Sequence, residues 1–148
     1  MDEILQRLFH ELKTVLHTDE FGYHAIIDDR LVPVYKNDTE GLNLEKWKMY
    51  HANNPVIIED DIVLTEVLRT QKSISIDNTN DNSDYPLCYG VFGIFSIYLV
   101  PVIKDDNVVG LIDMPVMGRY YSFKNDIKEQ CELIIRRYNE LLINNGMI

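Results

Sequence analysis

From Asp2 to about His17, apolar and polar positions alternate with the period of an α-helix. Charged side chains fill the positions between the apolar ones, as expected of a helix with one buried face. The apolar stripe consists of Ile4, Leu5, Leu8, Leu12, Val15 and Leu16. This pattern predicts an N-terminal helix that packs on the rest of the chain.

Two strands are predicted next. Phe21–Asp28 and Leu31–Tyr35 are rich in aromatic and β-branched residues, and Asp28–Arg30 between them supplies turn residues. Pro33 has no backbone N–H with which to donate a hydrogen bond to a neighbouring strand. We therefore expect the second strand to lie near a sheet edge.

Two short helices and a third strand are predicted in the middle of the chain. In the first helix, Leu44–His51, the side chains expected to point inward are Leu44, Trp47 and Met49. Asp60 or Asp61 is suited to cap the second helix. The buried face of that helix would consist of Val63, Leu64, Val67 and Leu68. Ser73–Asp77 then has the alternation of a strand.

The longest irregular segment comes directly before the most apolar one. Asn78–Tyr89 is rich in asparagine and aspartate and ends in aromatic residues, and polar loops of this length often carry function. Tyr89–Pro115 contains two apolar runs joined by the turn residues Lys104–Asn107, which predicts a β-hairpin. We expect the hairpin to form the floor of a site and the preceding loop to set its specificity.

A last helix is predicted after Ser122, which would cap it. Its apolar positions are separated by four, three, four and three residues, a heptad-like spacing, and are Ile127, Cys131, Ile134, Tyr138 and Leu141. Ile135 and Leu142 lie beside this seam. The seam would either pair with a second copy of the chain or pack on its own sheet. Asn144–Gly146 reads as a helix stop and favours a natural end of the chain.

These elements together predict one α+β domain over residues 1–148. Its centre would be an antiparallel sheet of five to six strands, because two amphipathic terminal helices need one sheet face to cover their apolar stripes. The short helices and the irregular loop would cover the other face and enclose a pocket there.

Composition and charge exclude several classes of protein. The formal net charge of −10 argues against nucleic acid and anionic membranes as partners, since both require clustered basic residues. No apolar run approaches the roughly 20 residues of a membrane span, and the N-terminus lacks a secretion signal. The two cysteines, Cys88 and Cys131, have no metal-ligand spacing and favour a cytoplasmic protein with free thiols.

Three local motifs follow one another along the chain. Arg69–Asp77 leads from a helix into a strand, Gly93–Pro101 joins a glycine and a serine to an apolar run that ends in proline, and Gly110–Ile112 opens the return strand. In their order and spacing, these motifs and the predicted elements resemble a GAF domain over nearly the whole chain. Two positions depart from the family pattern: Phe95 stands where a basic residue is common, and Gln71 replaces a frequent glycine.

The resemblance implies a GAF/PAS-like sheet with the terminal helices on one face and a ligand pocket on the other. It also implies a sensory role, in which the terminal helices continue as a helical bundle across the two-fold axis of a homodimer. Large amphipathic rings beside an apolar pocket can enclose a small ligand. The candidate ligand-binding residues are Trp47, Tyr50, Tyr85, Cys88, Tyr89 and Tyr98. Ordinary core packing is the competing interpretation for the aromatic residues.

No catalytic constellation is apparent. Nucleotide-binding glycine motifs and a GxSxG motif are absent, and the four histidines show no metal-ligand spacing. Some GAF-type proteins are free methionine-R-sulfoxide reductases and others attach bilins through a cysteine. Cys88 would serve such chemistry, with Asp113 as an acidic partner, but a second loop cysteine is absent. Cys131 is expected to pack in the core.

The leading hypothesis is therefore a non-enzymatic, cytoplasmic sensory domain that binds a small molecule and signals through its terminal helices. A free methionine-R-sulfoxide reductase that uses Cys88 is one alternative, and a dimerisation module without a pocket is another. The sequence names neither a cofactor nor a ligand, and it predicts no metal site.

Overall fold

The computed structural model describes residues 2–145. The strands are β1 (Gly22–Ile27), β2 (Arg30–Lys36), β3 (Val56–Ile57), β4 (Ile74–Ile76), β5 (Ile94–Lys104) and β6 (Asn107–Met117). The helices are α1 (Asp2–Val15), α2 (Leu44–Asn53), α3 (Ile62–Thr70), α4 (Leu87–Val91) and α5 (Asn125–Asn144), with a 3₁₀ turn η1 (Ile58–Asp60). The strands form one sheet in the order β3-β2-β1-β6-β5-β4, and every neighbouring pair is antiparallel.

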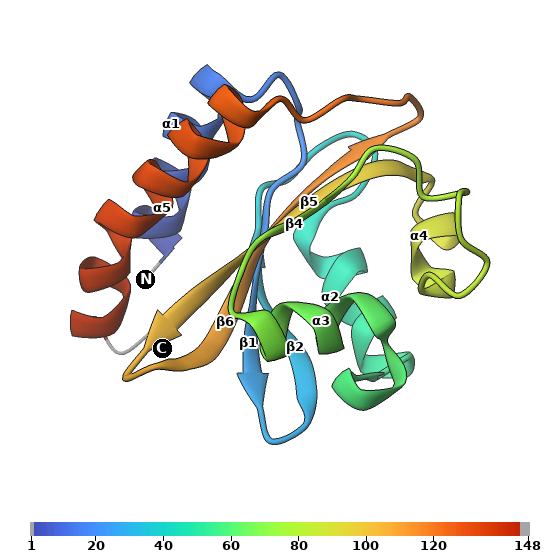
Figure 1. The fold of residues 1–148 in the computed structure, drawn as a ribbon, viewed down its shortest axis with the longest axis horizontal. Coiled ribbons are helices and arrows are strands. Elements are labelled where there is room, and N and C mark those ends of the chain that lie inside the picture. Colours follow the sequence, from blue (N-terminus) through green and yellow to red (C-terminus); the bar gives the residue numbers. More distant parts are fainter. Residues whose placement is uncertain (1, 146–148) are drawn as a thin grey trace.

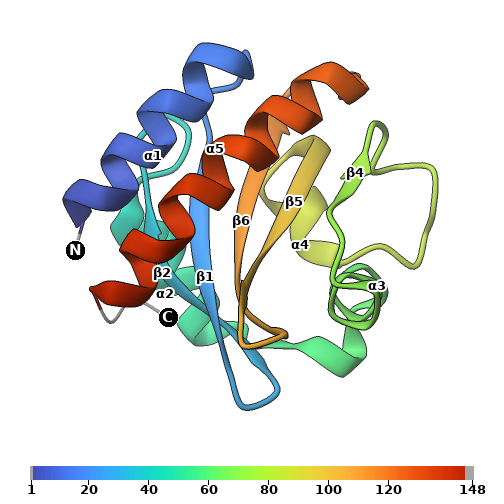
Figure 2. The same ribbon diagram turned by 60° about the vertical axis from the view of Figure 1, so that its left-hand side comes forward.

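The sheet separates two helical layers. Helices α1 and α5 lie on one face, whereas α2, α3 and α4 lie on the other (Figure 1). Figure 2 shows α1 and α5 side by side across the strands, and the two helices also pack against each other. The predicted α+β fold with terminal helices on one face of an antiparallel sheet is confirmed.

The main core lies between the sheet and the terminal helices. It is built from side chains of α1, α5 and the facing side of the strands, among them Leu5, Leu8, Leu12, Tyr98, Ile112, Met114, Cys131, Ile134, Ile135, Tyr138 and Leu142. Both helical stripes are therefore buried within the chain. Leu141, predicted to lie on the seam of the last helix, is instead 39% exposed.

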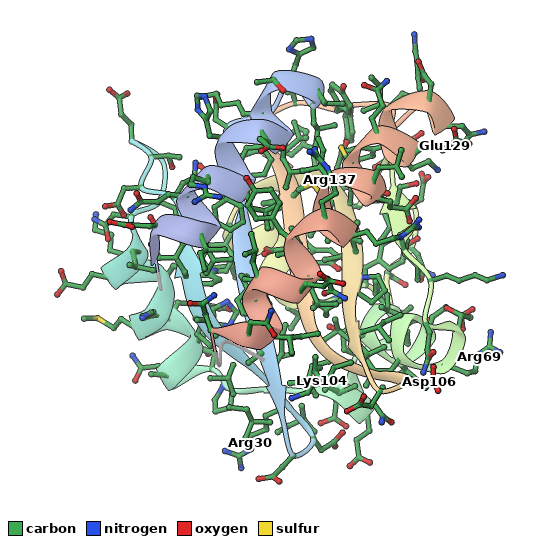
Figure 3. The ribbon with its side chains drawn as sticks, turned by 90° about the vertical axis from the view of Figure 1, so that its left-hand side faces the viewer. Arg30, Arg69, Lys104, Asp106, Glu129 and Arg137 are labelled. Atoms are coloured by element: carbon green, nitrogen blue, oxygen red, sulfur yellow. The ribbon has the colours of Figure 1, made fainter. Side chains whose placement is uncertain are left out.

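An ion pair joins the outer sides of the two terminal helices. Arg137 of α5 donates to the carboxylate of Glu11 on α1 at 3.0 Å, and Tyr138 donates to the same carboxylate at 2.7 Å. Arg137 lies on α5 close to α1 in Figure 3. These contacts hold α1 and α5 together as one layer.

The central hairpin is confirmed, with one correction at its start. β5 and β6 pair from Ile94 opposite Met117 to Lys104 opposite Asn107. The two turn residues, Asp105 and Asp106, have φ values of 50° and 62°, as a type I′ turn requires. Residues 89–91, predicted to begin the hairpin, belong instead to α4, because the first strand starts only after Gly93.

Of the predictions for helix caps and for one helix face, one is confirmed and two are wrong. Asp61 caps α3 by accepting from the N–H groups of Val63 and Leu64, as predicted. Ser122 does not cap α5; its hydroxyl donates to Asp77, and Lys124 occupies the N-cap position. Met49 is 59% exposed, so its predicted inward orientation is wrong.

Pro33 lies where the sheet ends. The edge strand β3 pairs only with Arg30 and Leu31 of β2, so the backbone at Pro33 faces no outer partner strand. The predicted edge-like position of this residue is confirmed. At the other end of the chain α5 stops at Asn144, whereas Gly146 of the predicted helix stop lies outside the described residues.

No helix within residues 2–145 is long and apolar enough for a membrane span.

Candidate functional site

A cavity of about 70 Å³ lies between the sheet and the layer of short helices. At roughly 10–15 Å³ per water molecule, it has room for about five waters or a small molecule of similar size. Most of its wall is apolar and comes from both layers, including Leu31, Trp47, Leu64, Phe92, Ile97, Leu99 and Leu111. The cavity lies on the sheet face opposite the terminal helices, where a pocket was predicted.

The central strands β1 and β6 supply the polar part of the cavity wall. Gly22 pairs with Asp113 and His24 pairs with Leu111, so these residues project from the same face of two adjacent strands. The pairing of β1 with β2 shifts register between Tyr23 and His24, where His24 lies opposite Pro33 of β2. The pairing of β1 with β6 places His24 beside Asp113.

Helix α2 covers this polar end with two rings one turn apart. Trp47 and His51 are four residues apart and share a helix face. The ring centroid of His24 lies 4.7 Å from that of Trp47 and 5.3 Å from that of His51, both edge-to-face. The three rings form one packed group, called here the ring cluster.

Several buried polar atoms at this end lack a hydrogen-bond partner among the described residues. They are Nδ1 and Nε2 of His24, Nδ1 of His51 and Oδ1 of Asp113. Nδ1 of His24 lies 3.4 Å from Oδ1 of Asp113, which is too long for a good hydrogen bond. Buried polar groups are nearly always partnered, so this constellation has hydrogen-bonding capacity to offer a ligand.

The imidazole of His51 is held neutral. Burial is the main cause and the neighbouring His24 the second, while the carboxylate of Asp113 acts in the opposite direction; together they lower the pKa of His51 to about 4. At neutral pH, His51 therefore offers one donor and one acceptor nitrogen and carries no charge.

A buried ion pair closes another part of the wall. The ammonium group of Lys36 lies 2.9 Å from the carboxylate of Glu20, and both side chains are almost fully buried. Lys36 also donates to the carbonyl oxygens of Asn37 and Leu42. An ammonium group has three N–H donors, and two of those of Lys36 are used by these carbonyl groups while its charge is paired with Glu20.

Helix α4 brings Cys88 and Tyr89 to the cavity. Burial, followed by the nearby carboxylate of Asp61, raises the pKa of the Cys88 thiol to about 11, with a smaller contribution from Asp113. The same three causes raise the pKa of the Tyr89 hydroxyl well above its ordinary value. Both groups are thus protonated at neutral pH. A nucleophilic thiolate needs a cationic neighbour, and no cationic side chain within residues 2–145 is among the causes that shift the pKa of Cys88.

Of the six predicted ligand-binding residues, three line the cavity together: Trp47, Cys88 and Tyr89. Two others, Tyr50 and Tyr85, do not line the cavity but pack against residues that do. Tyr50 packs on Phe92 with ring centroids 4.6 Å apart, and the ring of Tyr85 lies 6.4 Å from that of Tyr89.

Tyr98 lies on the wrong face of the sheet for the predicted role. It is fully buried among the core residues under the terminal helices, and its hydroxyl donates to the carbonyl oxygen of Lys128 on α5. Its chain neighbours Ile97 and Leu99 line the cavity. Because side chains alternate along a strand, a residue between two cavity residues must face away.

Two polar residues of this cavity, His24 and His51, were not predicted as site residues, and Asp113 was predicted only as an acidic partner of Cys88 in the reductase alternative. The spacing of Trp47 and His51 on one helix face was readable from the sequence. The approach of His24 to Asp113 was not, because it depends on the pairing of strands that are nearly ninety residues apart in the chain.

The described part of the chain has no cluster of side chains suited to a metal centre. Within residues 2–145, no group of three or more His, Cys, Asp and Glu side chains is placed to hold a metal ion. Cys131 is packed under the terminal helices, on the sheet face opposite Cys88, so it is not a partner for that thiol.

No family model matches this chain, and no curated protein matches it in sequence. Solved structures do match over nearly its whole length. The GAF domain/HD domain protein from Geobacter sulfurreducens has a TM-score of 0.82 at 11% identity, covering 99% of this chain and 94% of its own. The GAF domain of a two-component sensor histidine kinase from Bacillus halodurans has a TM-score of 0.72 at 15% identity, covering 99% and 96%.

A third, less similar structure is the reduced form of fRMsr from Staphylococcus aureus. Its TM-score is 0.59 at 17% identity, and the match covers 84% of this chain and 71% of that one. At sequence identities this low, the matches show a shared fold and nothing more.

Proposed function

We propose that this chain, which has the fold of GAF domains, is a sensory domain that binds a small molecule in the cavity beside the ring cluster. The observation that carries the proposal is the apolar cavity with unpartnered polar atoms at one end. Apolar walls with a few convergent polar groups are typical of small-molecule sites. A structural neighbour that is part of a sensor histidine kinase supports the sensory role.

The strand β6 would couple the cavity to the terminal helices. Asp113 projects into the cavity, whereas its neighbours Ile112 and Met114 are fully buried in the core under α1 and α5. A ligand that displaces the side chain of Asp113 would therefore favour one packing of the terminal helices over another. Occupancy would reach a partner through those helices.

A homodimer through the terminal helices is part of this proposal. Its contact surface differs from the apolar stripes predicted from the sequence. The predicted stripes are buried within the chain, so the contact would use the exposed apolar side chains of α5. Leu133 is 57% exposed and Leu141 is 39% exposed, two helical turns apart on one side. Light scattering of the wild type and of Leu133→Glu tests this contact; a dimer unaffected by the substitution counts against it.

The reductase alternative is disfavoured by the state of its thiol. Cys88 does line the cavity, but its pKa of about 11 keeps it protonated, and Cys131 lies on the other side of the sheet. Bilin attachment is disfavoured by size, since pockets for larger ligands are commonly ≈ 300 Å³ or more. The cavity itself argues against a module without a pocket.

A thermal-shift screen tests ligand binding. Amino acids, nucleotides, small amines and small carboxylates are added at saturating concentration, and at least one should raise the melting temperature. Trp47 is the only tryptophan of the chain and lines the cavity, so its fluorescence should change with the same ligand. Failure of every compound would overturn the proposal.

A matched pair of variants ties binding to the cavity. Leu31→Phe adds volume at a half-buried wall position, whereas Ile27→Phe makes the same kind of change at an exposed position on the same hairpin. The first should abolish the thermal shift, and the second should retain it. Equal behaviour of the two variants would place the ligand elsewhere.

A further inference from the structure

We propose that the ligand of this cavity is a small organic ammonium ion, a protonated primary amine on a short apolar body. This inference rests on the proposed ligand binding and names the ligand class. The geometry points to it through three features: an unpaired carboxylate, two further acceptors beside it, and a wall whose ammonium group is already paired.

The first feature is the charge balance of the wall. Three carboxylates and one ammonium group line the cavity: Glu20, Asp61, Asp113 and Lys36. Lys36 is paired with Glu20, and Asp61 caps the first turn of α3. Glu20 and Asp113 each have a buried oxygen without a hydrogen-bond partner among the described residues. The oxygen of Glu20 lies 2.9 Å from the ammonium group of Lys36, whereas that of Asp113 lies beside Nδ1 of His24 at 3.4 Å. A buried charge is costly unless it is paired, so the carboxylate of Asp113 favours a cationic ligand.

The second feature is the number of acceptors around that oxygen. A neutral imidazole has one acceptor nitrogen, so His51, whose pKa is lowered, adds one acceptor to Oδ1 of Asp113, and His24 adds a second in its neutral form. With the proton of His24 on Nδ1, which faces Asp113, the acceptor is its unpartnered Nε2. Three acceptors match the three N–H donors of a primary ammonium group.

The third feature is that the wall offers little to an anion. Lys36 donates to two backbone carbonyl groups and its charge is paired with Glu20, and the N–H groups of Val63 and Leu64 at the start of α3 are capped by Asp61. The carboxylates of Asp61 and Asp113 also contribute to raising the pKa of both Cys88 and Tyr89. These two carboxylates therefore disfavour a further negative charge beside Cys88 and Tyr89.

The remaining wall suits a short apolar body. Leu64, Leu99 and Leu111 face the cavity from three different elements. The indole of Trp47 adds an aromatic ring beside the proposed ammonium position, and such rings attract cations. A cavity for about five waters limits the body to roughly five non-hydrogen atoms.

Three probes of nearly equal shape test the inference: isobutylamine, isobutyramide and isobutyrate. Calorimetry at pH 7.5 should show binding of the amine at least ten-fold tighter than of the neutral amide, and no binding of the carboxylate. Asp113→Asn keeps the size of the side chain and removes its charge. It should weaken binding of the amine about ten- to hundred-fold, as expected for a hydrogen bond to a charged group.

Asp29→Asn is the matched control, because it makes the same change at an exposed turn and should leave amine binding unchanged. If Asp113→Asn does not fold, His51→Phe replaces one acceptor by a ring, and amine binding should weaken about five-fold. An amine that binds equally to wild type and to the folded variant would overturn the inference.

The outcomes separate this inference from the proposed function. Tighter binding of isobutyramide or isobutyrate than of isobutylamine overturns the ammonium assignment and leaves ligand binding standing. The same holds if the amine fails while the broad screen finds a neutral or anionic ligand. If no compound in either experiment binds, both proposals fail.

Discussion

Gly22 and Asp113 lie opposite each other on strands β1 and β6, and the missing side chain of Gly22 makes room for the carboxylate of Asp113. A Cβ atom at position 22 would overlap Oδ1 of Asp113. The carboxylate can therefore lie across the neighbouring strand and approach His24. One glycine thus positions the acidic group of the candidate site.

Gly22→Ala is expected to destabilise the protein by about 1–3 kcal/mol, because the added methyl group overpacks this position. Removing the obstructing carboxylate with Asp113→Ala should relieve much of that cost. Urea unfolding of the two single variants and the double variant measures this coupling. Gly41→Ala is the control, since its nearest neighbour would lie at an ordinary contact distance of 3.7 Å. Additive costs in the double variant would contradict the steric explanation.

Stability should fall on acidification because of His51. Its pKa is lowered from 6.5 to about 4 by burial and by His24, against the effect of Asp113. The unfolded chain therefore binds a proton near pH 6.5 that the folded protein resists. The contribution of His51 is fully present above pH 6.5 and is lost as the pH falls towards 4, by roughly 2 kcal/mol at pH 5.

Urea unfolding at pH 7.5 and pH 5 measures this effect. His51→Gln should lose less stability between the two pH values than the wild type, because it has no imidazole at this position to titrate. His17→Gln, at an exposed position of the chain, should retain the wild-type loss. An equal loss in His51→Gln and in the wild type would show that other groups are responsible.

Breaking the buried Lys36–Glu20 pair on one side should cost about 3–5 kcal/mol in unfolding free energy, because Lys36→Met leaves Glu20 buried without its counter-ion. The double variant Glu20→Gln/Lys36→Met should be more stable than Lys36→Met alone. The exposed pair Lys13–Asp19, at 3.2 Å, provides the control. Lys13→Met should change stability by less than about 1 kcal/mol, and equal costs at both positions would refute the role of burial.

The thiol of Cys88 should react slowly. Raising its pKa from 9.0 to about 11 reduces the thiolate fraction at pH 7.5 about 100-fold. Iodoacetamide labelling followed by peptide mass spectrometry should show that Cys88 is modified at least about 100-fold more slowly in the native protein than in urea. Fast native labelling, or loss of free methionine-R-sulfoxide in the presence of a thiol reductant, would revive the reductase alternative.

Tyr98→Phe tests the corrected position of this residue. The substitution removes only the hydroxyl that donates to the carbonyl oxygen of Lys128 at 3.3 Å, so it should cost at most about 1 kcal/mol and leave ligand affinity unchanged. Trp47→Phe changes a residue of the cavity wall and should weaken the ligand found by the screen. A Tyr98→Phe variant that loses affinity would contradict the placement under α5.

The fold could be predicted from the sequence because the patterns that specify its helices, turns and caps are local. The stripe of α1, the Asp-rich hairpin turn and the Asp61 cap each depend on residues within a few positions of one another, and each appears in the structure as predicted. Ser122 shows the limit of this reasoning, because its hydroxyl has a partner at Asp77 that no local pattern indicates.

The site depended on pairings that local patterns do not contain. Tyr98 and Trp47 were both predicted ligand contacts from the sequence. The alternation of side chains along β5 places Tyr98 under α5, and the packing of α2 on the other face of the sheet places Trp47 at the cavity. His24 and Asp113 became neighbours because β1 and β6 pair in the middle of the sheet. Sequence alone thus determined most of the segments that become helices and strands, with α4 as an exception. The tertiary structure decided which side chains face one another, because a shift of one residue in register reverses the face of every side chain.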